Sequence, residues 1–420
     1  MDDLPGAARR FLRYVQIDTQ SDPNSETTPS TEKQKDLGRM LLEELRALGV
    51  EDAMMDRWGY VFGTLPSTLP EVQAARTPVV ALLAHMDTAP DESGANVKPV
   101  VHRNYDGGAL TLPGDPAVRL DPERQPALLR HVGEDLITSD GTTLLGSDDK
   151  AGVAVLMQLA EDLVRDTETP RPKIRLCFTI DEEIGRGVDR LDLDVLGADV
   201  AYTLDGSGID TISFETFNAA AAKITVEGVM VHPGYAKGVM VNAARILAEM
   251  IAALPEAEAP ETTEGREGYF HPHTTTAGDA SHAEAQLILR DFTDEGMQRR
   301  KDFVTHLAAC FRLKYPGAKI TLEIRDQYKN MRSYIEEKDP RAIAFAHAAA
   351  EAMGITLEEE LVRGGTDGAR LSEMGLPTPN VFNGGYDYHS RFEWNTVQNL
   401  ERSLAYTKAL VRQWGEHGAE

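Results

Sequence analysis

The chain is poor in cysteine and has no long apolar run. Its 420 residues include only Cys177, in a strand-like stretch, and Cys310, in a helical pattern, so no disulfide framework is expected and a reducing compartment fits. The stretch MDDLPGAARRFLRYV is acidic and then amphipathic, without the uninterrupted apolar segment of a signal peptide or a membrane span. We therefore expect a cytoplasmic protein with no membrane partner.

Positive charge is also scarce. Lys and Arg number 43 against 68 Asp and Glu, which gives a formal net charge of -25. This excess repels nucleic acids and anionic membranes, so neither is expected as a partner. Hydrophobic residues make up 41% of the chain and charged residues 26%, as is typical of a soluble globular protein. A chain of 420 residues is too long for one ordinary core, so we predict two domains.

Residues 78–85 form a short continuous apolar run, typical of a strand buried on both faces, and the runs at residues 173–180 and 199–205 are also predicted to be strands. A helical pattern at residues 150–165 lies between the first two runs. This alternation predicts an α/β fold with a central, largely parallel sheet between helices.

The segments before and between these runs are less regular. Residues 5–17 and 31–48 are predicted to be helices, the second opened by Thr31 and Gln34 as a capping box. Residues 91–145 are rich in Gly, Pro and charge, and either short strands or long surface loops would fit them.

The pattern changes near residue 212. Alternating strands and two helices follow in the order of a split βαβ sandwich, which predicts an α+β domain with a four-stranded antiparallel sheet and two helices. The α/β pattern resumes after residue 326. We therefore expect residues 1–212 and 327–420 to form one domain, and residues 213–326 an inserted lid domain.

Two adjacent carboxylates, Asp148 and Asp149, stand in LLGSDDKAG, just before the helical pattern. Taken alone, they are most simply interpreted as helix N-caps. That alternative loses weight because other acidic or histidine-bearing stretches also lie at predicted strand ends.

His85 and Asp87 are the first of these, at the end of the first apolar run. Their spacing of two places both side chains on one side of an extended chain, so one could ligate a metal while the other orients it. Glu182 and Glu183 follow the second run, where one could bind a metal and the other face a water. Asp205 ends the third run.

His389 lies in GGYDYHSRFEW, a loop dense in glycine and aromatics. With it, the set contains two imidazoles and three carboxylates at the carboxyl ends of strands or in adjoining loops, where ligands bind in open α/β sheets. The set is His85, Asp148, Glu183, Asp205 and His389.

The charges of this set suit two divalent ions. Three carboxylates and one hydroxide balance two ions of charge plus two, and mixed nitrogen and oxygen donors suit Zn²⁺, with Co²⁺ or Mn²⁺ as alternatives. Two such ions about 3.5 to 4 Å apart can share one carboxylate and activate one water. Asp148 is the predicted bridge.

The chain resembles the peptidase T branch of the di-zinc metallopeptidases, which also include glutamate carboxypeptidase, aminoacylase and succinyl-diaminopimelate desuccinylase. The resemblance implies one metal held by His85, Asp148 and Asp205, and another held by Asp148, Glu183 and His389. It also implies that Glu182 is the general base and that Asp87 orients His85. It extends over nearly the whole length, through FLRYVQIDTQS, HMDTAPD, TLLGSDDKAG, DEEIGRG, TLDGSG, VHPGYAKGVMVNA, TEGREGYFH, LILRDF and RGGTDGARLSEMGLPTPNVFNGGYDYH.

Departures from the family pattern are few. Ser147 and Ser207 stand where the family usually has Ala or Gly, and SRF at residues 390–392 replaces a stretch that is often GKH. None touches a proposed ligand, but the last could alter the pocket wall beside His389 and with it the side-chain preference.

Within the predicted lid, the resemblance matches His232, Asn242 and Arg290 to residues that act on the substrate's carbonyl and carboxylate. An arginine offers a bidentate fork to a carboxylate. Arg363 in RGGTDG is a rival for that task, and a salt bridge from Arg290 to Asp291 or Asp294 is the structural alternative. Three further histidines are expected to be solvated in a Thr- and Ala-rich loop: His271, His273 and His282.

The resemblance implies an aminopeptidase that releases the N-terminal residue of tripeptides, with short peptides as its substrates. Two alternatives stay open: a dipeptidase or N-acyl-amino-acid hydrolase with the same chemistry, and a binding protein on an inactive peptidase scaffold. The presence of every ligand and of the base argues against the inactive scaffold. A homodimer through the lid domain is a further expectation.

Overall fold

The structure of the chain is a computed structural model, which describes residues 3–420. The chain divides into two compact units. Unit 1 runs to Phe214 and takes in Ser333–Glu360 and Thr366–Glu420, whereas unit 2 contains Glu215–Arg332 and Leu361–Gly365. None of the helices within residues 3–420 combines the length and apolar character that a membrane crossing requires.

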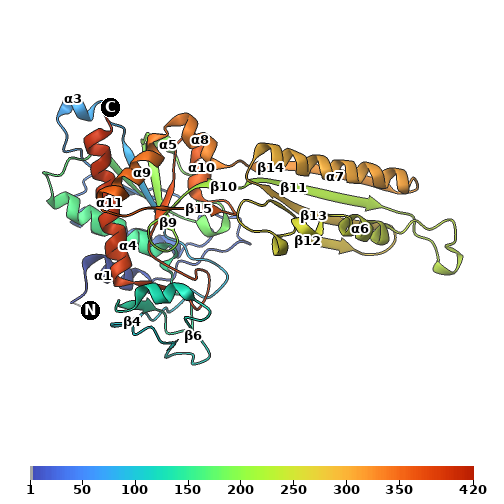
Figure 1. Cartoon of the computed structure of the whole chain (residues 1–420), viewed down its shortest axis with the longest axis horizontal. Coiled ribbons are helices and arrows are strands. Elements are labelled where there is room, and N and C mark those ends of the chain that lie inside the picture. The colour runs from blue at the N-terminus through green and yellow to red at the C-terminus, as the bar shows by residue number, and fades with distance from the viewer. Residues whose placement is uncertain (1–2) are drawn as a thin grey trace. The chain divides into compact units, whose positions relative to one another are not determined.

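Unit 1 is built on an eight-stranded sheet with the order β1-β2-β8-β3-β9-β16-β10-β15 (Figure 1). Its strands are β1 (Met54–Met55), β2 (Val61–Leu65), β3 (Val80–His85), β8 (Ile174–Thr179), β9 (Val200–Gly206), β10 (Thr211–Thr216), β15 (Glu358–Val362) and β16 (Asn380–Phe382). Parallel pairing occupies the centre, from β8 through β3 and β9 to β16, and antiparallel pairs flank it. The predicted α/β architecture is confirmed.

The central strands are apolar because both faces of the sheet are covered. Every residue of β3 (VALLAH) and β8 (IRLCFT) is buried, as expected for strands between two layers. Helix α4 packs against β3 and β9, and α1 and α11 pack on α4. The helices of this unit are α1 (Gly6–Tyr14), α2 (Gln34–Ala47), α3 (Glu71–Ala74), α4 (Ser147–Arg165), α5 (Leu193–Leu196), α8 (Met331–Lys338), α9 (Arg341–Ala352), α10 (Asp367–Glu373) and α11 (Val397–His417).

The irregular segment 91–145 forms short strands. A three-stranded sheet has the order β17-β7-β4, and β5 pairs with β6. A small core under it gathers around the buried ring of Trp394. These strands are β4 (Val100–His102), β5 (Leu110–Thr111), β6 (Arg119–Leu120), β7 (Leu136–Thr138) and β17 (Trp394–Thr396).

Unit 2 is the predicted α+β fold. Its antiparallel sheet has the order β12-β13-β11-β14 and carries helices α6 and α7. Alternate residues of β11, among them Ile224 and Val226, are buried against apolar side chains of both helices. The elements are β11 (Asn218–Glu227), α6 (Ala243–Ala252), β12 (Tyr269–Ala277), β13 (His282–Asp291), α7 (Asp294–Lys314) and β14 (Lys319–Tyr328).

Two local predictions are wrong. The capping box of α2 is not formed, because the helix begins after Lys33 without a side-chain cap and the Gln34 amide instead donates to Asp181 at 2.7 Å. The three lid histidines lie in strands rather than in a loop: His271 and His273 in β12, and His282 in β13. The Thr-rich sequence of β12, an edge strand of the sheet, suits an exposed strand as well as a loop, whereas β13 lies inside the sheet.

Candidate metal centre

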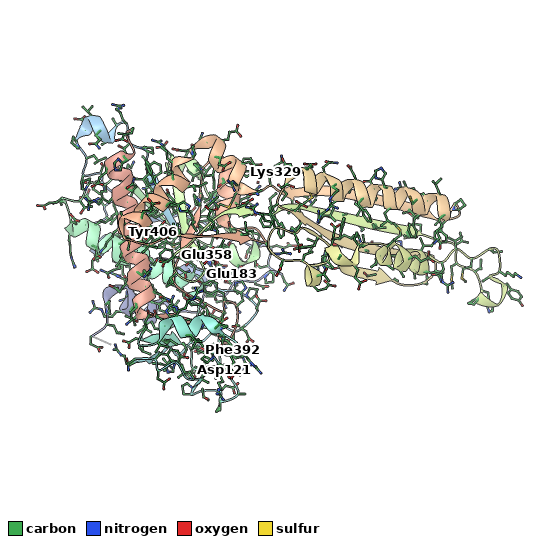
Figure 2. The ribbon with its side chains drawn as sticks, viewed as in Figure 1. Asp121, Glu183, Lys329, Glu358, Phe392 and Tyr406 are labelled. Atoms are coloured by element: carbon green, nitrogen blue, oxygen red, sulfur yellow. The ribbon has the colours of Figure 1, made fainter. Side chains whose placement is uncertain are left out.

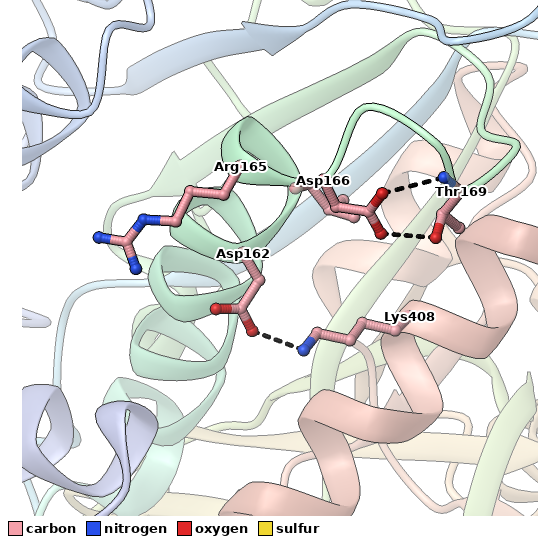
Figure 3. Close-up of a pocket in the computed structure, with 6 residues that line it drawn as sticks. Asp162, Arg165, Asp166, Thr169 and Lys408 are labelled. Carbon is pink, nitrogen blue, oxygen red and sulfur yellow. Dashed lines mark hydrogen bonds and ion pairs between the residues drawn. The ribbon is translucent and has the colours of Figure 1, made fainter.

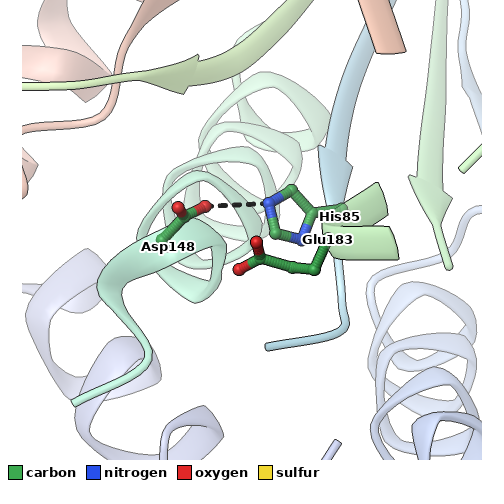
Figure 4. A group of neighbouring side chains, drawn as sticks. All are labelled: His85, Asp148 and Glu183. Carbon is green, nitrogen blue, oxygen red and sulfur yellow. Dashed lines mark hydrogen bonds and ion pairs between the residues drawn. The ribbon is translucent and has the colours of Figure 1, made fainter. Parts of the chain in front are cut away.

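His85 ends β3 and faces Asp148 at the start of α4. Nε2 of His85 lies 2.9 Å from Oδ1 of Asp148 (Figure 4). Both side chains are largely buried, with 2% of His85 and 12% of Asp148 exposed. Asp205, at the end of β9, places Oδ1 at 3.5 Å from the same imidazole nitrogen. The carboxyl ends of neighbouring parallel strands thus bring together side chains that are far apart in sequence.

The second oxygen of Asp148 faces another imidazole. Oδ2 lies 3.2 Å from Nε2 of His389, and Oε2 of Glu183 lies 2.8 Å from that same nitrogen. Glu183, labelled in Figure 2, follows β8 in a short 3-10 helix, Glu182–Ile184. Asp148 therefore stands between the two histidines, with one oxygen toward each.

Asp149 also lies near these groups, and His85, Asp149 and Asp205 could be joined by a single ion because their ligand atoms lie within 4.8 Å of one another. Both carboxylate oxygens of Asp149, however, already accept hydrogen bonds from the protein. Oδ2 accepts the backbone N–H of His85. Oδ1 accepts the backbone N–H of Gly152 and an N–H of the Asn383 side-chain amide, and the three distances are 2.9 to 3.2 Å. The N-cap interpretation thus fits Asp149, whereas Asp148 is turned toward the histidines.

Asp87 contacts both the histidine and the two glutamates. Nδ1 of His85 lies 3.1 Å from the backbone carbonyl of Asp87 and 3.4 Å from its carboxylate Oδ1, on the side of the ring away from Asp148. The same carboxylate accepts the backbone N–H groups of Glu182 at 3.0 Å and of Glu183 at 3.2 Å. Asp87 therefore orients the imidazole of His85 and also the start of the segment that carries Glu182 and Glu183.

The centre contains more carboxylates than there are cationic side chains nearby to balance their negative charge. Oε1 of Glu183 is buried without any hydrogen-bond partner among the described residues. Burial, reinforced by the charge of Asp148, raises the pKa of Glu183 to about 8. Burial, reinforced by Asp205, raises the pKa of Glu182 well above its usual range. An orphaned buried oxygen beside clustered carboxylates and imidazoles fits a site for divalent cations.

The two imidazoles carry the compensating charge in the metal-free protein. Hydrogen bonds to Asp148 and Glu183 raise the pKa of His389 to about 11. Burial lowers the pKa of His85, but Asp205 and Asp148 outweigh that effect and raise it well above its ordinary value. A bound cation would take the place of these protons, because a ligating imidazole must be neutral.

Three buried carboxylates around the centre were not predicted. Asp181 precedes Glu182 and accepts from the backbone N–H and hydroxyl of Ser30 and from Gln34. Asp367 accepts from Thr179 at 3.1 Å, and Glu393 accepts three backbone N–H groups near Asp148. The only sequence signal for these carboxylates is that they stand within or next to recognised motifs, because their hydrogen-bond partners lie far away in the sequence.

The predicted substrate-binding residues all lie in unit 2, and each of them has local partners. His232 accepts the backbone N–H of Gly234, and Asn242 caps α6 by accepting that of Arg245. Arg363 donates to the carbonyls of Gly265 and Glu267 and to Thr263. These contacts use most of the Arg363 guanidinium within the unit.

Arg290 does not form the predicted alternative salt bridge. Asp291 pairs with Arg300, and Asp294 lies 3.6 Å from Lys329. Arg290 instead donates to the carbonyl of Leu289 and to Gln327, beside the ring of Tyr328.

The fold and sequence match known peptidases. Residues 214–319 match the profile of a peptidase dimerisation domain. The crystal structure of aminopeptidase PepT from Bacillus cereus has a TM-score of 0.73 at 22% identity, and covers 97% of this chain and 98% of that chain. A dinuclear metal binding peptidase of the M20 family from Bacillus subtilis has a TM-score of 0.67 at 15% identity, covering 98% of both chains. At such identities the two structures demonstrate a shared fold.

Sequence identity carries the assignment further. The chain is 46% identical to peptidase T of Geobacillus kaustophilus over 403 residues, which are 96% of this chain and 97% of that protein. The candidate metal centre lies within this shared length. The chain belongs to the peptidase T family, the tripeptide aminopeptidases among the M20 metallopeptidases.

Proposed function

We propose that the chain holds two zinc ions per subunit and uses them to release the N-terminal residue of tripeptides. The observation that carries the proposal is the position of Asp148, whose two oxygens face His85 and His389 at 2.9 and 3.2 Å. A carboxylate placed in this way is suited to bridge two cations.

Two sets of side chains would hold the ions. One consists of His85, Asp148 and Asp205, and the other of Asp148, Glu183 and His389. Nitrogen and oxygen donors without thiolate suit Zn²⁺, and Co²⁺ or Mn²⁺ could substitute for it. When bound, the ions would lower the pKa of a water and polarise the scissile carbonyl.

Glu182 is the proposed base. Its carboxylate accepts a proton from the attacking water and returns that proton to the departing amine, so that one residue serves both half-steps. Asp87 has a positioning role, because its carboxylate contacts His85 and the backbone of Glu182.

We assign residues 1–212 and 327–420 to a catalytic domain and residues 213–326 to a lid. His232, Asn242 and Arg290 of the lid, and Arg363 of the catalytic domain, are the proposed contacts to the substrate's carbonyl and carboxylate. Arg290 is the first choice for the carboxylate, since Arg363 already donates to two carbonyls and a hydroxyl.

The match to a peptidase dimerisation domain supports a homodimer through the lid, which light scattering of the purified protein would test. A cytoplasmic location is also proposed and agrees with the absence of a disulfide between Cys177 and Cys310.

The proposed function is tested by loading the metal-stripped protein with Zn²⁺ and assaying a tripeptide, a dipeptide and an N-acyl amino acid in parallel. Release of the first residue from the tripeptide, with two ions per chain by elemental analysis, is the expected result. Faster turnover of the dipeptide or the acyl amino acid would favour the alternative substrate class. No turnover of any substrate in the loaded protein would indicate an inactive scaffold.

A further inference from the structure

Glu393 is a buried carboxylate that the proposed reaction does not use. Its side chain is 1% exposed and lies just before β17, on the segment that also carries His389. Oε2 accepts the backbone N–H groups of Leu145 and Gly146, both at 2.8 Å, and Oε1 accepts that of Asp148 at 3.0 Å. Both oxygens are therefore committed to one short loop.

That loop cannot satisfy its own donors. Gly146 has a φ of 83°, and Asp148 and Asp149 have non-helical backbone angles, so the regular turns of α4 begin only after them. N–H groups ahead of the first helical turn have no carbonyl partner within the helix. An ionised carboxylate that accepts several of them forms strong, charge-assisted hydrogen bonds.

Two amides reinforce the same connection. Asn383 donates to Asp149 at 2.9 Å, and Asn395 donates to Ser147 at 2.8 Å. Residues 383–395 thus hold residues 145–149 at several successive positions, and Glu393 holds the backbone of Asp148 itself.

We propose that Glu393 is a positioning residue that sets the separation between Asp148 and His389, and through it the affinity of the cation site that these two residues share with Glu183. The inference rests on the proposed function. His85 pairs with Thr179 in the ladder between β3 and β8, and Asp205 lies in β9, which pairs with β3, so strand pairing positions both residues without Glu393. Loss of Glu393 should therefore weaken the site at His389 more than the site at His85.

Glutamine cannot replace this carboxylate. Its amide has one acceptor oxygen, and its nitrogen is a donor. In either orientation the nitrogen faces a backbone N–H, from Asp148 or from Leu145 and Gly146. Glu393→Gln therefore keeps the volume of the side chain and removes part of the clamp.

The test is a calorimetric titration of Zn²⁺ into metal-stripped parent, Glu393→Gln and Asp166→Asn proteins. Asp166 is a matched control because its carboxylate also accepts backbone N–H groups, from Glu168 and Thr169, in the turn after the far end of α4 (Figure 3). We expect Glu393→Gln to weaken one of the two binding steps by at least about tenfold and to leave the other within about threefold of the parent. Asp166→Asn should change neither step.

If the role of Glu393 is merely structural, both variants will melt at a lower temperature than the parent, and both Zn²⁺ binding steps will be unchanged. That result would overturn the proposal. If Glu393→Gln fails to fold, Glu393→Asp decides: it keeps two acceptor oxygens on a shorter stem, so a weakened step supports the proposal and two unchanged steps contradict it. A parent that binds two ions but cleaves no tripeptide refutes only the proposed function, because the titrations still measure the role of Glu393.

Discussion

The carboxylate of Asp87 accepts the backbone N–H of Glu182 at 3.0 Å while its Oδ1 lies 3.4 Å from Nδ1 of His85. A candidate metal ligand and the proposed base are thus aligned by one buried side chain. This arrangement differs from a simple carboxylate–histidine pair, in which the carboxylate would serve the imidazole alone.

Asp87→Asn should therefore impair more than metal binding. An asparagine has one acceptor oxygen and cannot accept from Glu182 and Glu183 while also accepting from His85. We expect kcat for a tripeptide to fall about ten- to a hundredfold even at Zn²⁺ concentrations that restore full metal content. Recovery of the parent kcat at saturating Zn²⁺ would limit Asp87 to orienting His85.

The adjacent glutamates should separate in their effects. Glu182→Gln should abolish turnover and keep the metal content near that of the parent, because an amide cannot accept the proton of water. Glu183→Gln should lose metal as well, since the unpartnered Oε1 and the oxygen 2.8 Å from His389 belong to that side chain. Elemental analysis after dialysis gives the comparison, and equal metal loss in both variants would contradict these roles.

Metal loading should release protons. The raised pKa of His389, to about 11, and the raised pKa of His85 leave both imidazoles protonated in the metal-free protein at pH 7.5. Ligation requires them to be neutral, so the affinity for Zn²⁺ should fall on acidification, by about tenfold per pH unit for each proton released. Titration calorimetry in buffers of different ionisation enthalpy counts these protons.

The same shifts determine the stability of the metal-free protein. A histidine whose pKa is raised above the value of about 6.5 in the unfolded chain contributes stability that is fully present below that pH. This contribution is lost as the pH rises through the folded-state value, about 11 for His389. The metal-free protein should therefore melt at a lower temperature at pH 10 than at pH 7, and His389→Ala should reduce the difference. An unchanged pH dependence in that variant would mean that another group is responsible.

The carboxylate clamp can be tested with a tripeptide and its C-terminal amide. A bidentate arginine to carboxylate contact contributes about 1.5 to 3 kcal/mol net, so Arg290→Ala should lower kcat/KM for the free tripeptide about ten- to a hundredfold. The amide should be affected much less. If the parent cleaves both peptides equally, no clamp operates. If Arg290→Ala still discriminates as the parent does, Arg363→Ala becomes the next variant to compare.

Much of the fold was predictable from local sequence patterns. The predicted strands at residues 78–85, 173–180 and 199–205 form β3, β8 and β9, whose residues are almost all buried because both faces of their sheet are covered. The alternation after residue 212 likewise predicted the antiparallel sheet of unit 2. In the first case burial leaves a mainly apolar run in the chain, and in the second it leaves an alternation of period two.

The candidate ligands were also proposed from sequence, because each lies at a predicted strand end or in an adjoining loop and belongs to a recognisable motif. Their division between two cations was implied by resemblance, and no pattern in the chain measures it. The distances from Asp148 to His85 and to His389 supply the geometry for that division.

Only the tertiary structure identifies the residues that hold the candidate ligands and their loops in position. The predicted capping box failed because the Gln34 side chain is bonded to Asp181, 147 positions further along the chain: its oxygen accepts the backbone N–H of Asp181 and its nitrogen donates to the carboxylate. Glu393 reaches the backbone of Asp148 across 245 positions. A local pattern records which face of an element is buried, but a hydrogen bond between distant segments depends on how the whole sheet and its loops bring them together. The sequence by itself therefore determined the central strands, the antiparallel sheet of unit 2 and the chemistry of the candidate ligands, and only folding decided which buried carboxylates hold those ligands in place.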